Sequence, residues 1–480
     1  MPSSVFDCNN IYIKYLPKWK KCRDVVQGED SVKAAGEVYI PRSSGMDDKD
    51  YRDYLMRAQF FNATGRTLDG LSGMLNRKPL IVNVPNGMEK YLENVDGKGH
   101  SINQFGALCS RDTIITNWGG VLVDMPYLEE VRSQRDFEES DQYAYMVFYR
   151  AESITKWKWQ TNGRKQSLKY VIFKELVEVE SAPYTTELKE YRRVCEIDET
   201  GYYRQTLYDS NENIIKQVYP SSKKGKFREI PFYFLSSSDM PSESMIEDVA
   251  NVNLSHLRKS ADYENGLHWS GVPTPWSQGA DPQIEMINGE EVAKPLKLGG
   301  SIVVNLPAGA SMHYLEYGGA GCSSIAAAMS SDEERMAILG ARIISHERKG
   351  VEAAETARLH HASENSVLAE FAINLSIIFS KLVKIYLEWS SGKELAEEDV
   401  KVSFNTDYDV STMSAQQITA LVALWQSGGI AKRDLFDNLK DGEILSAERD
   451  FNEMNAEIDE EQMAKNAQYA AMQNVISEQS

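Results

Sequence analysis

The strongest periodic pattern in the chain is a run of apolar residues that predicts one long amphipathic helix ending near Trp389. The run recurs at steps of three and four: Val367, Phe371, Leu375, Ile378, Leu382, Ile385 and Trp389. Side chains spaced in this way share one helix face, which must be buried against other elements. Within this region, Lys381, Lys384 and polar residues interrupt the apolar stretch 371–389, unlike a lipid-facing span, and we expect no membrane segment in the chain. The pattern therefore predicts a fold in which further elements cover this helix.

The first 241 residues predict a mixture of helices and strands. Residues 11–28 read as a helix that begins after Pro17, and residues 47–75 carry apolar side chains at helical intervals. Short β-branched and aromatic runs then alternate with turn formers. These runs are 119–126, 143–150, 168–179, 190–197, 201–208 and 230–235. We expect an α+β fold with a β-rich part in this region.

Two helical patterns frame a segment rich in proline and glycine. The first helix is expected over 243–269, and residues 271–320 then hold five prolines and two strand-like pieces. Helical texture returns at 322–344, where Ser331 and Glu334 form a possible capping box for a shorter helix. We favour a single helix, because five apolar residues keep one period across that point. They are Ile325, Met329, Met336, Leu339 and Ile343.

Charge and cysteine content restrict the function classes. With 52 Lys and Arg against 71 Asp and Glu, the net charge is −19. An acidic surface repels phosphate, which argues against a conventional DNA-binding protein but is compatible with a conduit that must not hold DNA; alternatively, the acidity only aids solubility. The five cysteines show no C-x-x-C pair, so we expect reduced thiols in a cytosolic fold without zinc or a redox centre. The N-terminus lacks the pattern of a signal peptide.

The sequence offers little catalytic chemistry. It has no phosphate-binding glycine loop, and Asp124, which precedes a Met-Pro turn, is interpreted as a turn former rather than a base. The adjacent His360 and His361 cannot share one helix face and are not expected to bind metal. We therefore expect no catalytic residues, no metal, no cofactor and no enzyme activity.

One polar stretch between two predicted helices is distinctly cationic. His346, Arg348 and Lys349 precede Gly350 and would form a compact positive loop in an acidic protein. The loop could contact phosphates. Alternatively, it is a solvated loop whose cations lie near the carbonyl groups that end the preceding helix.

Several separated segments of the chain resemble, in the same order, segments of phage portal proteins. The closest resemblance is to a large portal-like family of phage and prophage proteins long catalogued as of unknown function. For example, NLSHLRKSADYENGLHWSGVPTPW looks like the passage from that family's first stem helix into its clip. The segments are 39–79, 253–276, 298–321 with 334–344, 353–376 and 404–430. The resemblance covers residues 10–445, with only β texture shared over 130–235.

The resemblance implies a portal fold with a helical stem, a small β-containing clip, an α/β wing and a helical crown. The implied parts are a wing (1–241), first stem helix (242–269), clip (270–320), second stem helix (321–344), tunnel loop (345–356), long spine helix with the return strand of the wing (357–408), and crown with C-terminal tail (409–480). Subunits of this kind form a ring, usually of twelve copies, at one capsid vertex. DNA is packaged and ejected through the ring, which also joins head to tail.

The resemblance also implies partners and site residues. Expected partners are the terminase large subunit, major capsid and scaffolding proteins, head-completion or tail adaptor proteins, and double-stranded DNA held without sequence preference. The protein would reside in the virion, and in the host cytoplasm during assembly. His346, Arg348 and Lys349 become candidates for weak, salt-sensitive phosphate contacts in the tunnel loop. Stem residues expected at subunit interfaces or in the core are Val249, Leu257, Ile325, Met329, Leu339 and Ile343.

Two other functions compete with this interpretation. Another minor head or connector protein of a virion would share the composition but lack a DNA channel. An acidic cytosolic enzyme would instead hold converging ionisable groups in a deep pocket. A ring with a central hole would separate the portal interpretation from both.

Overall fold

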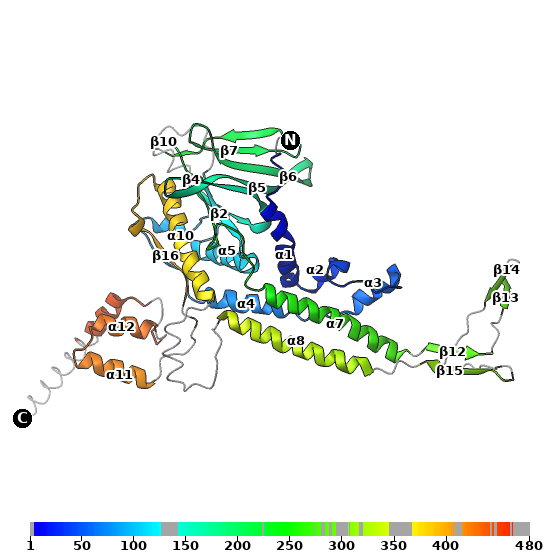
Figure 1. Cartoon of the computed structure of the whole chain (residues 1–480). Coiled ribbons are helices and arrows are strands. Elements are labelled where there is room, and N and C mark those ends of the chain that lie inside the picture. The colour runs from blue at the N-terminus through cyan, green and yellow to red at the C-terminus, as the bar shows by residue number, and fades with distance from the viewer. Residues whose placement is uncertain are drawn as a thin grey trace, which may run out of the picture. The chain divides into compact units, whose positions relative to one another are not determined.

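A computed structural model of the chain describes most of its residues (Figure 1). The described residues are 4–125, 143–222, 225–272, 274–279, 284–287, 290–293, 306, 308–315, 320–344, 367–406, 408, 415–441, 444–445, 449–460 and 463. They divide into two compact units, Met1–Thr406 and Asp407–Ser480. The first unit contains both helices and β-sheets, as the α+β prediction requires.

Helices dominate the first hundred residues of the first unit. They are α1 (Asn10–Gln27), α2 (Glu29–Ala34), the 3-10 turn η1 (Gly36–Val38), α3 (Asp48–Arg57), α4 (Ala63–Leu75), the 3-10 turn η2 (Glu89–Leu92) and α5 (Ile102–Thr116). Side chains cap the starts of several of these helices: Asp47 caps α3, and Ser101 and Gln104 form a capping box on α5.

One of the helix predictions for this region is wrong in detail. The α1 helix begins at Asn10 rather than after Pro17, with the Asn9 side chain accepting a hydrogen bond from the Ile11 amide. An interior proline costs about 3 kcal/mol, and the burial of Tyr12 and Trp19 on either side offsets that cost. The apolar residues at helical intervals over 47–75 lie in two helices, α3 and α4, because Asn62 caps a new start by accepting from the Gly65 amide.

Two antiparallel sheets form the β-rich part. One has the order β11-β2-β3 and the other the order β4-β5-β6-β7-β8. Their strands are β2 (Gly119–Asp124), β3 (Tyr145–Arg150), β4 (Ile154–Asn162), β5 (Lys165–Ala182), β6 (Thr185–Ile197), β7 (Tyr203–Tyr208), β8 (Ile214–Val218) and β11 (Phe232–Phe234). A short hairpin of β9 (Ser221–Ser222) and β10 (Gly225–Lys226) and the 3-10 turn η3 (Ala151–Ser153) complete this part. The core between these elements is aromatic, with Tyr149 stacked on Phe173 at 3.8 Å between ring centroids.

The proline-rich excursion lies between two long helices. The α7 helix (Glu247–Gly271) leads into β12 (Thr274–Gln278), and β15 (Ser311–Leu315) leads into α8 (Ala320–Ile344). Strands β12 and β15 pair antiparallel, and a second small pair is formed by β13 (Ile284–Ile287) and β14 (Glu290–Ala293). The single helix favoured over 322–344 is confirmed, and no described residue breaks it at Ser331.

The amphipathic run that dominates the sequence forms α10 (Val367–Ser391). Its buried face includes Phe371, Leu375, Leu382 and Trp389. Ser376 and Ser380 accept hydrogen bonds from the amides of Phe404 and Val402, which tie the helix to β16 (Lys401–Ser403) beyond the 3-10 turn η4 (Glu397–Asp399). Strand β16 pairs with β1 (Ile81–Asn83), so the chain returns to its N-terminal part.

The second unit is helical where it is described. It contains α11 (Ala415–Gln426), α12 (Lys432–Asp441) and helical residues 451–460. Phe436 and Phe451 pack edge to face at 5.4 Å between ring centroids. Across both units, all five cysteines are free thiols, and no described helix is long and apolar enough to cross a membrane.

Candidate functional site

The candidate site is the helix pair α7 and α8, which lie side by side and lead into the β12–β15 ribbon (Figure 1). Two polar side-chain contacts set their antiparallel register. Lys259 Nζ lies 2.6 Å from Asp332 Oδ2, and one turn away His256 Nε2 lies 3.3 Å from Glu333 Oε1. The Asp332 side chain is only 3% exposed, so its charge is compensated inside the interface. These contacts, together with apolar packing, hold α7 and α8 as one rod.

The N-terminal helices hold α7 along much of its length. Asn253 is fully buried: its Oδ1 accepts hydrogen bonds from the Thr64 amide and hydroxyl, and its Nδ2 donates to the Phe61 carbonyl. Further along, the Tyr54 hydroxyl donates to Asp262 at 2.7 Å. A buried amide with all of these partners restricts where α4 can cross α7. The α7 helix is therefore fixed to the body of the first unit.

The α8 helix also crosses α4, and a glycine makes the crossing close. A Cβ atom on Gly340 would lie 3.3 Å from Thr67 Oγ1, tighter than ordinary contact. The end of α8 is thus anchored while much of one face stays open.

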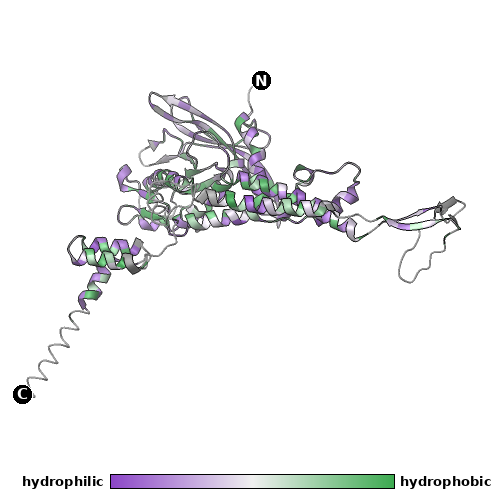
Figure 2. Cartoon of the chain, turned by 60° about the horizontal axis from the view of Figure 1, so that its bottom comes forward, coloured by the Kyte–Doolittle hydropathy of each residue, from purple (hydrophilic) through white to green (hydrophobic). Residues whose placement is uncertain are grey.

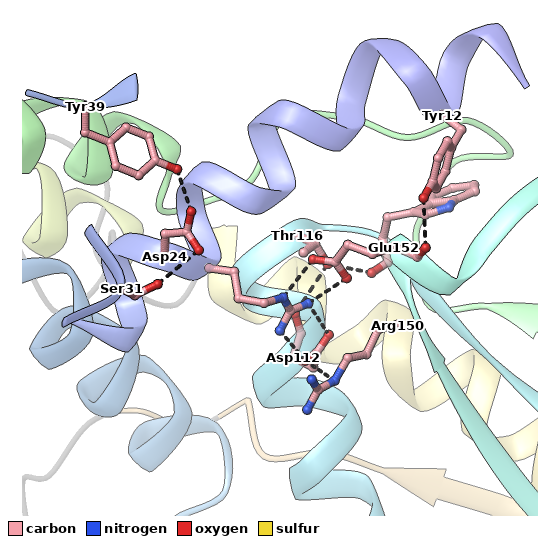
Figure 3. Close-up of polar contacts among 10 residues, drawn as sticks. Tyr12, Asp24, Ser31, Tyr39, Asp112, Thr116, Arg150 and Glu152 are labelled. Carbon is pink, nitrogen blue, oxygen red and sulfur yellow. Dashed lines mark hydrogen bonds and ion pairs between the residues drawn. The ribbon is translucent and has the colours of Figure 1, made fainter. Parts of the chain in front are cut away.

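A buried ionic cluster anchors α1, which contacts the start of α7 (Figure 3). Arg23 donates to both oxygens of Asp112 on α5 and to both oxygens of Glu152. Burial disfavours the charge on Arg23, but these hydrogen bonds outweigh it and raise the pKa of the guanidinium above its usual value. Beyond the cluster, Lys21 Nζ lies 3.0 Å from the buried Glu247 at the start of α7. The cluster therefore links the β-rich part to the helix pair.

The open face of α8 carries small and hydroxyl side chains. Its exposed residues recur at helical spacing: Ser323, Ser324, Ala327, Ser330, Ser331, Glu334, Ala337 and Ile338. Arg335 lies at the edge of this face and approaches Asp332 at 3.9 Å, and no lysine occurs on the described part of α8. The hydropathy colouring shows polar and apolar residues mixed along the two helices (Figure 2). Such a face holds no strong site for an anion.

Apolar side chains are exposed where the helices pass into the ribbon. Trp269 and Val272 at the end of α7, with Trp276, Tyr314 and Leu315 on the ribbon, are each more than a third exposed. Trp276 lies opposite His313 in the strand register, with 5.3 Å between their rings. Exposed aromatic side chains grouped in this way are typical of surfaces that bind another protein.

The six predicted stem residues fall into three groups. Val249 and Leu257 are fully buried in α7 and belong to the core of the single chain. Ile325, Met329 and Leu339 are only half-buried on the side of α8 that also carries Asp332. The side chain of Ile343 lies outside the described residues, as do the tunnel-loop candidates His346, Arg348 and Lys349.

Asp124, which the sequence suggests as a turn former, has its main contacts across strands. Its carboxylate accepts hydrogen bonds from Gln205 at 3.0 Å and Tyr145 at 3.2 Å, and Arg193 lies 3.5 Å away. Arg193 in turn donates to Glu175. These groups come from both sheets and satisfy one another's hydrogen bonds, which is the arrangement of a structural cluster.

Sequence reasoning missed several of these contacts. Asn253 and His256 interrupt the apolar face of α7, and a polar residue at a core position is a signal for a buried hydrogen bond. Asp332 gave a weaker signal, because it lies in the polar run SSDEER, which also reads as an exposed helix surface. Its ion pair with Lys259 depends on the tertiary fold alone.

Comparison with known proteins matches a family and several particle structures. A family model described as "Domain of unknown function (DUF4055)" matches residues 245–390, from the start of α7 to the end of α10. No curated protein matches the chain.

Solved structures give weak overall likeness. A chain of the virion of a native gene transfer agent particle is 12% identical with a TM-score of 0.37, over 85% of this chain and 98% of that one. A chain of the neck of the empty particle, computed with C6 symmetry, is 14% identical with a TM-score of 0.37, over 86% of this chain and 98% of that one. A chain of the neck of the native particle, computed with C12 symmetry, is 14% identical with a TM-score of 0.33, over 79% of this chain and 90% of that one. At these TM-scores the neighbours assign no function to the chain.

Proposed function

We propose that this chain is a phage portal protein. It forms a ring at one capsid vertex, the conduit for DNA packaging by the terminase and for genome ejection, and the platform for head–tail joining. In this role it is a structural protein of the virion, carries no catalytic site and assembles in the host cytoplasm.

The arrangement of α7, the β ribbon and α8 is the observation that carries the proposal. Each helix has 25 residues, which corresponds to a length of about 37 Å. The α7 helix is fixed to the body, whereas α8 leaves one face open. Copies of such a rod placed side by side in a ring would build a continuous wall, with Ile325, Met329 and Leu339 available for contacts between copies.

The composition of the wall suits DNA that must slide. The open face of α8 offers serines, alanines, Ile338 and one glutamate, and the whole chain carries a net charge of −19. DNA would find few cations to bind it there, so passage would not be interrupted by strong phosphate contacts. Within this proposal, His346, Arg348 and Lys349 make weak contacts that are independent of sequence.

The β ribbon is the proposed docking site for other virion proteins. Its exposed Trp276, Tyr314 and Leu315 suit the terminase large subunit during packaging and a head-completion or tail adaptor afterwards. Major capsid and scaffolding proteins are expected to contact other surfaces of the ring.

Native mass spectrometry of the purified chain, with negative-stain imaging of the same sample, tests the proposal. The expected result is a closed ring near twelve copies with a central hole. A monomer or dimer that stays small at high protein concentration and moderate salt would contradict the portal role and favour another minor head or connector protein.

A further inference from the structure

Strands β5 and β6 extend well beyond the sheet that contains them. Strand β4 pairs with β5 only as far as Phe173, and β7 pairs with β6 only from Arg192. Between these points the two strands pair with each other alone, up to Ala182 and Thr185. Residues 176–190 therefore form a two-stranded arm, and its main-chain edges have no strand beside them among the described residues.

The arm exposes large apolar side chains. Leu176 and Leu188 are 59% and 67% exposed, and the register places both on one face of the arm. Tyr184 at the tip is fully exposed and has φ +64°, a backbone conformation that disfavours bulky side chains. An exposed ribbon with apolar residues and free edges is prone to aggregate with other chains. A specific partner that covers the ribbon would prevent this aggregation.

The two ends of this sheet carry opposite charge. The arm contains four glutamates and Lys189, a net charge of −4 + 1 = −3 over residues 176–190. At the other end, residues 154–170 of the β4–β5 hairpin contain five basic residues and no acidic residue, a net charge of +5. Lys158, Arg164 and Lys169 of this basic hairpin are exposed, and none forms an ion pair with a described residue.

Strand geometry places these charges at opposite ends of one rigid element. The basic hairpin turns at Asn162–Lys165, whereas the arm turns at Ala182–Thr185, at the far end of β5. Within one copy the arm therefore points away from its own basic hairpin. A second copy placed in line can bring the two together, and contacts of this head-to-tail kind close a ring when the rotation between copies allows it.

We infer that the acidic arm of one copy docks on the basic hairpin of the next copy of this chain. Glu178 and Glu180, which share a face of the arm with Leu176 and Leu188, face Lys158 and Lys169 of the neighbouring copy. Leu176, Leu188 and Tyr184 are removed from solvent in the contact. The contact rests on the proposed function, because it is a second link between subunits of the ring, apart from the α7–α8 rods. The opposite charges of the arm and the basic hairpin orient two copies as they approach each other. They disfavour the arrangement in which two arms or two basic hairpins meet.

Charge reversal and exchange test the contact. Glu178→Lys with Glu180→Lys, and separately Lys158→Glu with Lys169→Glu, place like charges across it. Each double variant should raise the protein concentration needed for ring formation by about tenfold or more at low salt. The four changes in one chain restore opposite charges and should return that concentration to within about twofold of the unmodified protein.

A matched control separates the contact from net charge. Glu397→Lys with Glu398→Lys makes the same change in charge on the exposed η4 turn and should leave assembly unchanged. Tyr184→Gly provides a further variant that removes backbone strain, so its unfolding temperature should not fall although the ring weakens. If the basic hairpin instead serves DNA, its reversal should abolish DNA retention and leave assembly unchanged, which would overturn the inference.

Disulfide cross-linking tests directly whether the arm of one copy lies next to the basic hairpin of another. Leu188→Cys with Arg164→Cys should give a ladder of disulfide-linked copies on oxidation, whereas either change alone should not. Four of the native cysteines are buried and Cys8 is half-buried, so the background is low. Rings that form in the unmodified protein but show no ladder and no charge-exchange effect would overturn the inference and leave the proposed function standing. Failure of the unmodified protein to assemble would overturn both.

Discussion

At the scale of single residues, the ion pairs of the buried Arg23 side chain with Asp112 and Glu152 should stabilise the first unit. Arg23→Met would leave the buried Asp112 with only the more exposed Arg150, at 3.2 Å, and should destabilise the first unit by about 3 kcal/mol. Arg111→Met removes an exposed pair with Asp69 and should cost less than about 1 kcal/mol. Urea unfolding measures the free energy of unfolding of both variants. Equal losses of this free energy would show that the buried cluster stabilises the fold no more than an exposed ion pair does.

The hydrogen bonds of a second single residue, Asp198, predict that the stability of the fold depends on pH. Hydrogen bonds from the Thr200 side chain and from the Tyr202 amide lower the pKa of its carboxyl from 3.8 to about 2. Since the folded-state pKa is below the unfolded value, the contribution to stability is present above about pH 4 and is lost as the pH falls to about 2. Asp198→Asn should flatten this part of the curve of unfolding temperature against pH, and parallel curves would contradict the assignment.

At the scale of elements, two glycines with different surroundings should respond oppositely to alanine. Gly70 lies at an exposed position of α4 with nothing within 4 Å of an added Cβ, so Gly70→Ala should stabilise the fold by about 0.5–1 kcal/mol. Gly120 lies in β2, where a Cβ would meet Phe232 Cζ at 2.1 Å and the Tyr233 carbonyl at 2.9 Å. Gly120→Ala should cost about 3 kcal/mol. Thermal unfolding of both variants checks the packing of β2 against β11.

Periodicity predicted the elements whose apolar residues repeat without interruption. The α10 helix and the unbroken α8 helix were found in this way, because packing on one face leaves a clear pattern in the sequence. The split at Asn62 and the early start of α1 were not found, because a cap and a tolerated proline depend on a few atoms. The arm was also missed: its tip, ESAPYTTE, is polar with a proline and reads as a loop.

At the scale of the whole molecule, the candidate site was predicted as a helix pair but not as a set of contacts. Val249 and Leu257 were expected at an interface or in the core, and in the single chain they are core. Ile325, Met329 and Leu339 could pack within the chain or contact another copy of it. Periodicity shows that such residues are buried on one face, but it does not show whether the covering surface belongs to the same copy. The contacts of Asn253 and Asp332 arise only when α4, α7 and α8 meet.

A density map of the assembled protein by electron cryomicroscopy tests the portal role most directly. The predicted result is a closed ring with an axial hole, in which the face of α8 carrying Ser323, Ala327 and Ser331 lines the hole and α7 lies outside it. An assembly with no axial hole, or one in which this face of α8 points to the exterior, would contradict the account.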